Sequence, residues 1–140
     1  MKRTWIMPNL KFNDIVHLGL SVSNLDASIK WYEQVLALQL VNKMDLADRS
    51  VAFVVNSSTG LVIALAQHSQ GIKGDFNEMR TGLDHIAFGV ESKDDLDAWE
   101  SQFSSLGVVH SPVSHMEIGS VLVFRDPDNI QLEMFWRNPS

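Results

Sequence analysis

The pattern of apolar and polar residues is similar in the two halves of the chain. Each half contains a short apolar run with one histidine near its start, "IVHLGLSV" at residues 15–22 and "LDHIAFGV" at residues 83–90. The two histidines, His17 and His85, lie 68 residues apart. Short runs of this kind, rich in β-branched and aromatic residues, predict a strand in each half.

A helix is predicted directly after each of these strands. In the first half, Ser23 and Asp26 have the S-x-x-D spacing of a capping box, and apolar residues then recur at helical spacing at Leu25, Ile29, Tyr32 and Leu36. In the second half, Ser92 and Asp95 repeat the box, and Gly107 supplies a stop. The second apolar stripe consists of Leu96, Trp99, Phe103 and Leu106.

Beyond each helix the apolar period falls to two, which predicts strands. The predicted strands are 50–55 and 60–66 in the first half and 120–125 and 130–136 in the second, separated by the turn sequences "NSSTG" and "DPDN". Additional strands near 38–46 and 108–114 would make each half a βαβββ unit. The same order of elements in both halves indicates an internal duplication.

This repeat predicts the organisation of the whole chain. We expect an N-terminal arm at 1–12, a first βαβββ module at 13–67, a linker at 68–82, a second module at 83–137 and a tail at 138–140. The predicted fold class is α+β, with paired βαβββ modules forming a curled, barrel-like mixed sheet around a cleft.

The faces of the two histidine strands predict where a site would form. Side chains alternate between the faces of a strand, so the bulky residues at Leu20 and Phe88 should pack on the helices. The histidine faces carry only small neighbours such as Gly19 and Ala87. Two sheets curled toward each other would therefore enclose a hollow with one histidine from each.

Glu133 is the third member of this constellation. It lies in the apolar run "IQLEMFW", where an unpaired carboxylate is costly and a cation would offset the cost. Two neutral imidazoles and one carboxylate are a common ligand set for Fe(II), Mn(II), Zn(II) or Ni(II). We therefore predict that His17, His85 and Glu133 bind a divalent metal ion with coordination positions left open for a substrate.

Composition narrows the classes of function. The 140 residues contain no cysteine, which excludes disulfides and thiolate metal sites and makes a cytoplasmic location the default expectation. The formal net charge of −6 argues against nucleic-acid binding. No apolar stretch approaches the length of a membrane span, and the N-terminus lacks the pattern of a signal peptide.

These residues resemble the vicinal oxygen chelate superfamily, which includes glyoxalase I, extradiol dioxygenases, fosfomycin-resistance proteins and bleomycin-resistance proteins. The matching segments are "VHLGLSVSNLDASIKWYEQVLAL", "LDHIAFGVES" and "SVLVFRDPDNIQLEMFW", which together span about residues 13 to 137. The resemblance implies paired βαβββ modules, a metal held by His17, His85 and Glu133, and a homodimer.

Departures from the family pattern limit the choice of activity. Ala64 aligns with Glu133, at a place where glyoxalase I-like enzymes have a glutamate that acts as a fourth ligand and proton-transfer base, so true glyoxalase I is disfavoured. Fosfomycin-modifying members place cationic residues beyond the last strand, where this chain has only Arg137. Ala37 stands where the family commonly has glycine at the end of the helix.

The resulting expectation is a metal-dependent enzyme that acts on a small-molecule substrate with two adjacent oxygens, by lyase, isomerase or extradiol-type ring-cleavage chemistry. The alternative is a non-catalytic binding or resistance protein that sequesters a small aromatic or toxic ligand. The remaining candidates for catalytic roles are His68, which is in phase with Ala64, and His115, which lies in or beside a predicted loop.

Overall fold

The computed structural model describes Lys2, Thr4 and residues 10–139, and two βαβββ units follow one another along the chain. The first unit consists of β1 (Leu18–Ser21), α1 (Leu25–Leu36), β2 (Gln39–Asp45), β3 (Arg49–Val55) and β4 (Val62–His68). The second consists of β5 (Ile86–Gly89), α2 (Lys93–Leu106), β6 (Ser114–Met116), β7 (Gly119–Arg125) and β8 (Gln131–Arg137). The predicted α+β class and the paired modules are confirmed.

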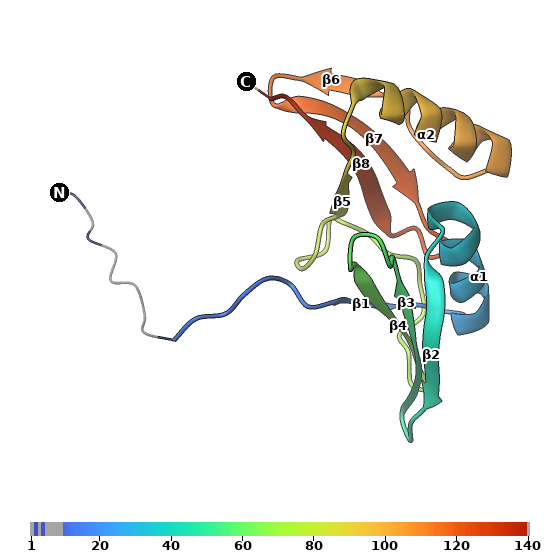
Figure 1. Cartoon of the computed structure of the whole chain (residues 1–140). Helices are drawn as coiled ribbons and strands as arrows, with labels where there is room; N and C mark the ends of the chain where they lie inside the picture. The colour runs from blue at the N-terminus through green and yellow to red at the C-terminus, as the bar shows by residue number, and fades with distance from the viewer. Residues whose placement is uncertain (1, 3, 5–9, 140) are drawn as a thin grey trace.

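The two units form two separate four-stranded sheets of the same topology. The strand orders are β1-β4-β3-β2 and β5-β8-β7-β6, and in each sheet only the first pair is parallel. Among the described residues, the two sheets do not join into a closed barrel. Figure 1 shows the sheets as two curved layers, with each helix against one face of its own sheet. The other face of each sheet carries no helix, and we call these two surfaces the open faces.

Alternation along the strands separates the core from the open faces. Leu20, Leu65, Leu122 and Leu132 point to the helix side and are buried in one continuous core that spans both units. Burial of such side chains stabilises each helix on its sheet by roughly 1.5–3 kcal/mol per large residue. The predicted inward packing of the bulky strand positions is confirmed.

Helix α1 also connects the two units. The ring of Trp31 stacks on Phe124 of β7, with ring centroids 6.3 Å apart. The hydroxyl of Tyr32 donates a 2.8 Å hydrogen bond to Asp126 in the β7–β8 turn. The backbone N–H of Ser23 donates to Asp128 in the same turn. The first helix is therefore fixed to the second sheet.

The helix ends agree in part with the sequence. The capping box of Ser92 and Asp95 and the stop at Gly107 are confirmed. The predicted box of Ser23 and Asp26 is wrong: Asn24 is the N-cap, because its side chain accepts from the Ala27 N–H and so satisfies the first turn.

Two further expectations are corrected. The strand expected near 108–114 is interrupted: His110 forms a single β-bridge with Phe124 of β7, and the regular strand β6 runs only from Ser114 to Met116. The break falls at Pro112, which has no N–H, and at Val113, whose N–H donates to Glu100 rather than to a strand. Leu106 does not complete the apolar stripe of α2, since it lies at the last helical residue and is 45% exposed.

The boundaries predicted for the arm, linker and tail stay predictions, and parts of the arm and tail lie outside the described residues. The described arm residues Leu10 and Phe12 are exposed. The segment between β4 and β5 has no regular structure, but it is held to the second unit by hydrogen bonds from Phe76 N to Asp128 O and from Arg125 to Glu78. In residues 10–139, neither helix is long and apolar enough to cross a membrane.

Candidate metal centre

His85 and Glu133 come together on the open face of the second sheet. Strand β5 pairs in parallel with β8, so that Ala87 lies beside Glu133, and His85 lies one residue before the strand begins. The His85 Nε2 atom is 3.6 Å from the Glu133 Oε2 atom. Two donors held by one ion at ordinary bond lengths lie about 3 to 3.5 Å apart, so the pair is close to the spacing that a divalent metal requires.

The surroundings of Glu133 are mainly apolar. The side chain is only 13% exposed, and its strand neighbours on the same face are Ala87 and Val123. Phe135, two residues further along β8, lies on the same face. A carboxylate in such surroundings is costly unless a cation or hydrogen-bond donors offset its charge. A divalent cation would do so, and the donor set of one carboxylate oxygen and one imidazole nitrogen fits it.

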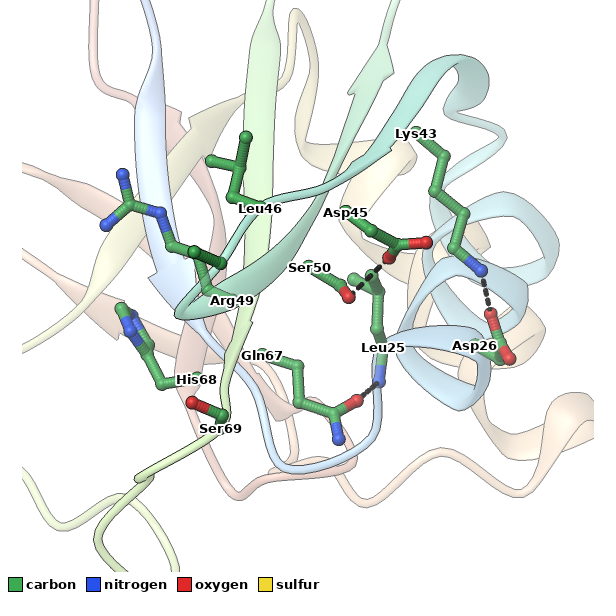
Figure 2. Close-up of a pocket in the computed structure, with 11 residues that line it drawn as sticks. Leu25, Asp26, Lys43, Asp45, Leu46, Arg49, Ser50, Gln67, His68 and Ser69 are labelled. Atoms are coloured by element: carbon green, nitrogen blue, oxygen red, sulfur yellow. Dashed lines mark hydrogen bonds and ion pairs between the residues drawn. The ribbon is translucent and has the colours of Figure 1, made fainter.

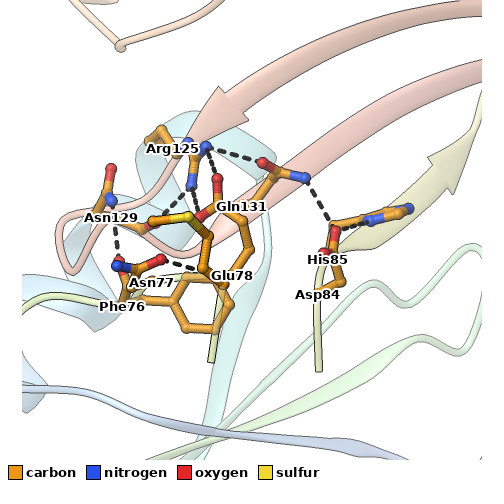
Figure 3. A network of polar contacts seen from close by, with 9 residues as sticks. Phe76, Asn77, Glu78, Asp84, His85, Arg125, Asn129 and Gln131 are labelled. Atoms are coloured by element: carbon orange, nitrogen blue, oxygen red, sulfur yellow. Dashed lines mark hydrogen bonds and ion pairs between the residues drawn. The ribbon is translucent and has the colours of Figure 1, made fainter. Parts of the chain in front are cut away.

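A chain of polar contacts leads to His85 from the segment before β5 (Figure 3). The His85 Nδ1 atom is 2.7 Å from Asp84 Oδ1, which also accepts a hydrogen bond from Gln131. Arg125 donates to Gln131 and makes a two-bond ion pair with Glu78. Hydrogen bonding from Arg125 is the main cause that lowers the pKa of Glu78 to about 2.

His17 lies on the other sheet, away from this pair. It precedes β1 by one residue, and its ring contacts Phe53 of β3 edge-on with centroids 6.3 Å apart. Within the described residues, no group of three or more His, Cys, Asp or Glu side chains is placed to hold a metal ion. The structure thus brings together His85 and Glu133 but not His17, and the three-residue site stays a prediction.

The two further histidines also lie apart from the pair. His68 ends β4 beside Arg49 and lines a cavity of about 330 Å³ (Figure 2), in which Lys43 and Asp26 form an ion pair on the other side. His115 in β6 bonds the hydroxyl of Ser120, which lies on the helix side of the sheet. Neither contacts His85 or Glu133 in the single chain.

The equivalence of Ala64 and Glu133 is confirmed by strand register. Ala64 lies beside Gly19 of β1 and Phe53 of β3, just as Glu133 lies beside Ala87 of β5 and Val123 of β7. The first sheet therefore has a methyl group where the second has a carboxylate. No acid–base group comes from this position.

The residues that support His85 were not among the predicted site residues. Asp84 immediately precedes the histidine, and Gln131 lies two residues before Glu133, hence on the same face of β8. Both spacings can be recognised in the sequence and could have identified Asp84 and Gln131 as supporting residues. The contact of Arg125 with Glu78 joins residues 47 positions apart, and no local pattern predicts it.

A comparison with protein families identifies the family of this chain. The model of the Glyoxalase/Bleomycin resistance protein/Dioxygenase superfamily matches residues 14–134. The chain belongs to this superfamily. The match runs from just before β1 into β8 and includes His17, His85 and Glu133, in agreement with the resemblance drawn from the sequence.

Individual relatives include proteins with a named activity. The chain is 30% identical over 130 residues to a metallothiol transferase FosB from Bacillus licheniformis, covering 91% of this chain and 78% of the relative. It is 29% identical over 125 residues to a metallothiol transferase FosB from Shouchella clausii, covering 87% of this chain and 79% of the relative.

Solved structures agree with the fold. A glyoxylase/bleomycin resistance protein/dioxygenase domain from Frankia sp. EAN1pec matches with a TM-score of 0.84 and 35% identity, covering 91% of this chain and all of that one (100%). The fosfomycin resistance protein FosX from Listeria monocytogenes matches with a TM-score of 0.73 and 18% identity, covering 92% of this chain and 94% of that one. At that identity the second likeness concerns the fold alone.

Proposed function

We propose that this protein is a metal-dependent enzyme that binds a small substrate through two neighbouring oxygen atoms. The observation that carries the proposal is the 3.6 Å approach of His85 Nε2 to Glu133 Oε2 on the open face of the second sheet. In this proposal the metal is Fe(II), Mn(II), Zn(II) or Ni(II), held by His85, Glu133 and His17.

The third ligand, His17, would come from a second copy of the chain. His17 lies on the first sheet, whose open face carries Phe53, Ala64 and small residues. The open face of the second sheet carries Phe135 and Val123 around Glu133. Two copies related by a twofold axis would set the first sheet of each against the second sheet of the other, which covers both apolar faces and produces two identical sites. The two apolar open faces support the predicted homodimer.

The residues around the pair determine what the site could accept. Ala87 and Gly89 in β5 leave space beside Glu133. Phe135 offers an apolar wall to the hydrocarbon part of a substrate. When bound, the metal would supply a Lewis acid that polarises the substrate oxygens and stabilises negative charge developing on them. Ala64 contributes no proton transfer. His68 lies on the same face of β4 as Ala64 and is the candidate general acid or base, whereas His115 bonds Ser120 on the helix side of the second sheet.

Thiol transfer is a second candidate reaction beside lyase, isomerase and ring-cleavage chemistry. It is favoured by the two metallothiol transferases, which align with about nine-tenths of this chain, 91% and 87%. Arg125, a cation on the open face of the second sheet, is engaged by Glu78. A substrate anion would therefore rely on the metal rather than on this guanidinium.

The test is anaerobic purification with metal analysis, followed by assays of the loaded protein. Samples carrying Mn(II), Fe(II), Zn(II) or Ni(II) are given a thiol with fosfomycin, a catechol with O₂, or a hemithioacetal, and products are identified by mass spectrometry. We expect metal-dependent turnover of one of these classes, abolished in Glu133→Gln. A protein that takes up metal and binds the probes without turnover would support the sequestering alternative instead. A protein that takes up no divalent metal would contradict the proposal.

A cytoplasmic location stays a prediction.

A further inference from the structure

We propose that Asp84 is a positioning residue, which holds the His85 ring with its proton on Nδ1 and its Nε2 lone pair toward Glu133. In this account Gln131 and the Arg125–Glu78 pair hold Asp84 in turn. The inference rests on the proposed function, because it concerns how the chain presents one of the ligands to the metal.

The first step is the contact between neighbouring residues Asp84 and His85. The His85 Nδ1 atom lies 2.7 Å from Asp84 Oδ1, and an ionised carboxylate can only accept a hydrogen bond. The proton must therefore be on Nδ1. In the neutral ring this leaves the lone pair on Nε2, the atom that lies 3.6 Å from Glu133 Oε2. Metal ligands of this type are commonly oriented by a carboxylate on the other ring nitrogen.

The second step is what holds Asp84. Its side chain is 61% exposed, so a single hydrogen bond to His85 would compete with water. Gln131 Nε2 lies 3.4 Å from the same oxygen of Asp84. The orientation of that amide is determined by Arg125, which has only donors and places Nη2 at 2.8 Å from Gln131 Oε1. The NH₂ group of Gln131 must then face Asp84.

The third step is the anchor of Arg125. Its guanidinium donates to both oxygens of Glu78 at 2.9 and 3.0 Å and to the backbone carbonyl of Asn129 at 3.1 Å. A two-bond pair of this kind restricts the guanidinium plane as well as its position. Glu78 belongs to the segment between β4 and β5. A continuous chain of hydrogen bonds thus connects that segment to the metal-facing histidine (Figure 3).

The first module does not repeat this device, although it repeats the histidine. The positions equivalent to Asp84 and Gln131 are Val16 and Val62, whose side chains cannot hydrogen-bond an imidazole. The ring of His17 instead contacts Phe53. His85 is therefore oriented before the metal arrives, whereas His17 has no equivalent carboxylate. This difference indicates that the arrangement serves His85 and is not a by-product of the duplicated fold.

The test combines a spectroscopic measurement on metal-free protein with a metal titration. Long-range ¹H–¹⁵N NMR of ¹⁵N-histidine protein reports the tautomer of each ring, and His85→Gln identifies the His85 signals by their loss. We expect the Nδ1–H form of His85 in the parent and a shift toward the Nε2–H form in Asp84→Ala, with a smaller shift in Gln131→Ala. Asp97→Ala, which removes an exposed carboxylate of α2, is the matched control and should leave the tautomer unchanged.

Zinc affinity, measured by competition with a chromophoric chelator, is the second measurement. Asp84→Ala should bind Zn²⁺ about 10–100-fold more weakly than the parent, while Asp97→Ala stays within about twofold. The same tautomer in parent and Asp84→Ala would overturn the proposal, even if affinity fell. Should the parent bind no zinc while its tautomer still depends on Asp84, the positioning role stands and the metal function is contradicted.

Discussion

The hydroxyl of Tyr32 lies 2.8 Å from Asp126 Oδ2 and joins the helix of the first module to the β7–β8 turn of the second. Both groups are buried, and the other oxygen of Asp126 accepts the backbone N–H groups of Asp128 and Ile130. One carboxylate therefore shapes the turn that leads into β8 and also fixes α1 against it. Through this turn the modules hold the strand that carries Glu133.

Tyr32→Phe should destabilise the protein by about 1–3 kcal/mol, because it keeps the ring but leaves a buried carboxylate without one of its donors. The measurement is the free energy of unfolding from urea denaturation, with the dependence on urea expected to stay unchanged. Ser50→Ala, which removes an exposed hydroxyl bonded to Asp45, is the control and should alter stability by less than about 0.5 kcal/mol. An equally small effect in Tyr32→Phe would contradict the prediction.

Tyr32 also predicts a loss of stability at alkaline pH. Burial, and then the charge of Asp126, raise the pKa of Tyr32 far above its ordinary value of 10.0. At a pH above 10.0 the unfolded chain releases the phenolic proton, while the folded chain retains it. The unfolded state then binds fewer protons, so the free energy of unfolding falls as pH rises.

Tyr32 is the only tyrosine, so the ultraviolet absorbance of tyrosinate reports this residue directly. We expect the absorbance to appear only together with the loss of circular dichroism. Tyrosinate absorbance that develops near the ordinary pKa of 10.0 in a folded sample would show that the phenol is not buried as described.

The end of α1 provides a test of backbone strain. Ala37 adopts φ 54° and ψ 30°, a left-handed conformation that costs an L-residue about 1–2 kcal/mol. Ala37→Gly should therefore stabilise the protein by about 0.5–1 kcal/mol, after allowing for the greater freedom of glycine in the unfolded chain.

The second helix offers the reverse experiment. Gly107 occupies the same position at φ 70°, and a methyl group on its Cα would meet only open space, so Gly107→Ala should destabilise through the backbone alone. Thermal unfolding of both variants should give shifts of opposite sign. Shifts of the same sign would mean that contacts, and not the left-handed backbone, determine these positions.

Much of the fold could be predicted because local periodicity determines it. The strands around His17 and Glu133 and the cap at Ser92 follow from alternation and from short spacings. The cap at Asn24 was missed because Ser23 and Asn24 are adjacent residues that can both accept from the first turn. The shift of β6 depends on Pro112 and on the bond between Val113 and Glu100, which only tertiary structure reveals.

The candidate site could be predicted only in part, because strand pairing within a module follows from the sequence but the placement of the two modules does not. Pairing of β5 with β8 brings His85 to Glu133, and a common strand register within one module is enough to predict it. The separation of His17 from the pair depends on how the two modules are placed relative to each other. That placement is determined by α1 packing on the β7–β8 turn, through Tyr32 and Trp31, and no repeat in the sequence encodes it.

Ala64 allows the metal site to be extended. Because Ala64 occupies the position in the first sheet that Glu133 occupies in the second, Ala64→Glu should add a fourth ligand and tighten metal binding. Ala66→Glu places the same charge on the same face one pleat further along β4 and is the matched control. Zinc titration of both folded variants is the measurement. Equal affinity in Ala64→Glu and the parent would mean that this position does not face the metal.

The central claim is that each metal site takes His85 and Glu133 from one copy and His17 from another. His17→Ala and Glu133→Gln should each lose most of their metal, since two remaining ligands hold a divalent ion poorly. Glu133→Gln should lower thermal stability only in metal-loaded samples, because the metal stabilises the folded state it binds. Mixed dimers of the two variants distinguish a site shared between two copies from a site formed within one chain.

Metal content of purified mixed dimers is the most direct measurement of this claim. In a His17→Ala/Glu133→Gln dimer, one site regains all three ligands, so we expect half of the parent's metal content. In a His85→Ala/Glu133→Gln dimer, each copy still contributes both of these positions to one site, so each of the two sites lacks one ligand. No site is restored, and metal should stay near zero. Absence of metal from the first mixed dimer, or undiminished metal in Glu133→Gln alone, would contradict the account.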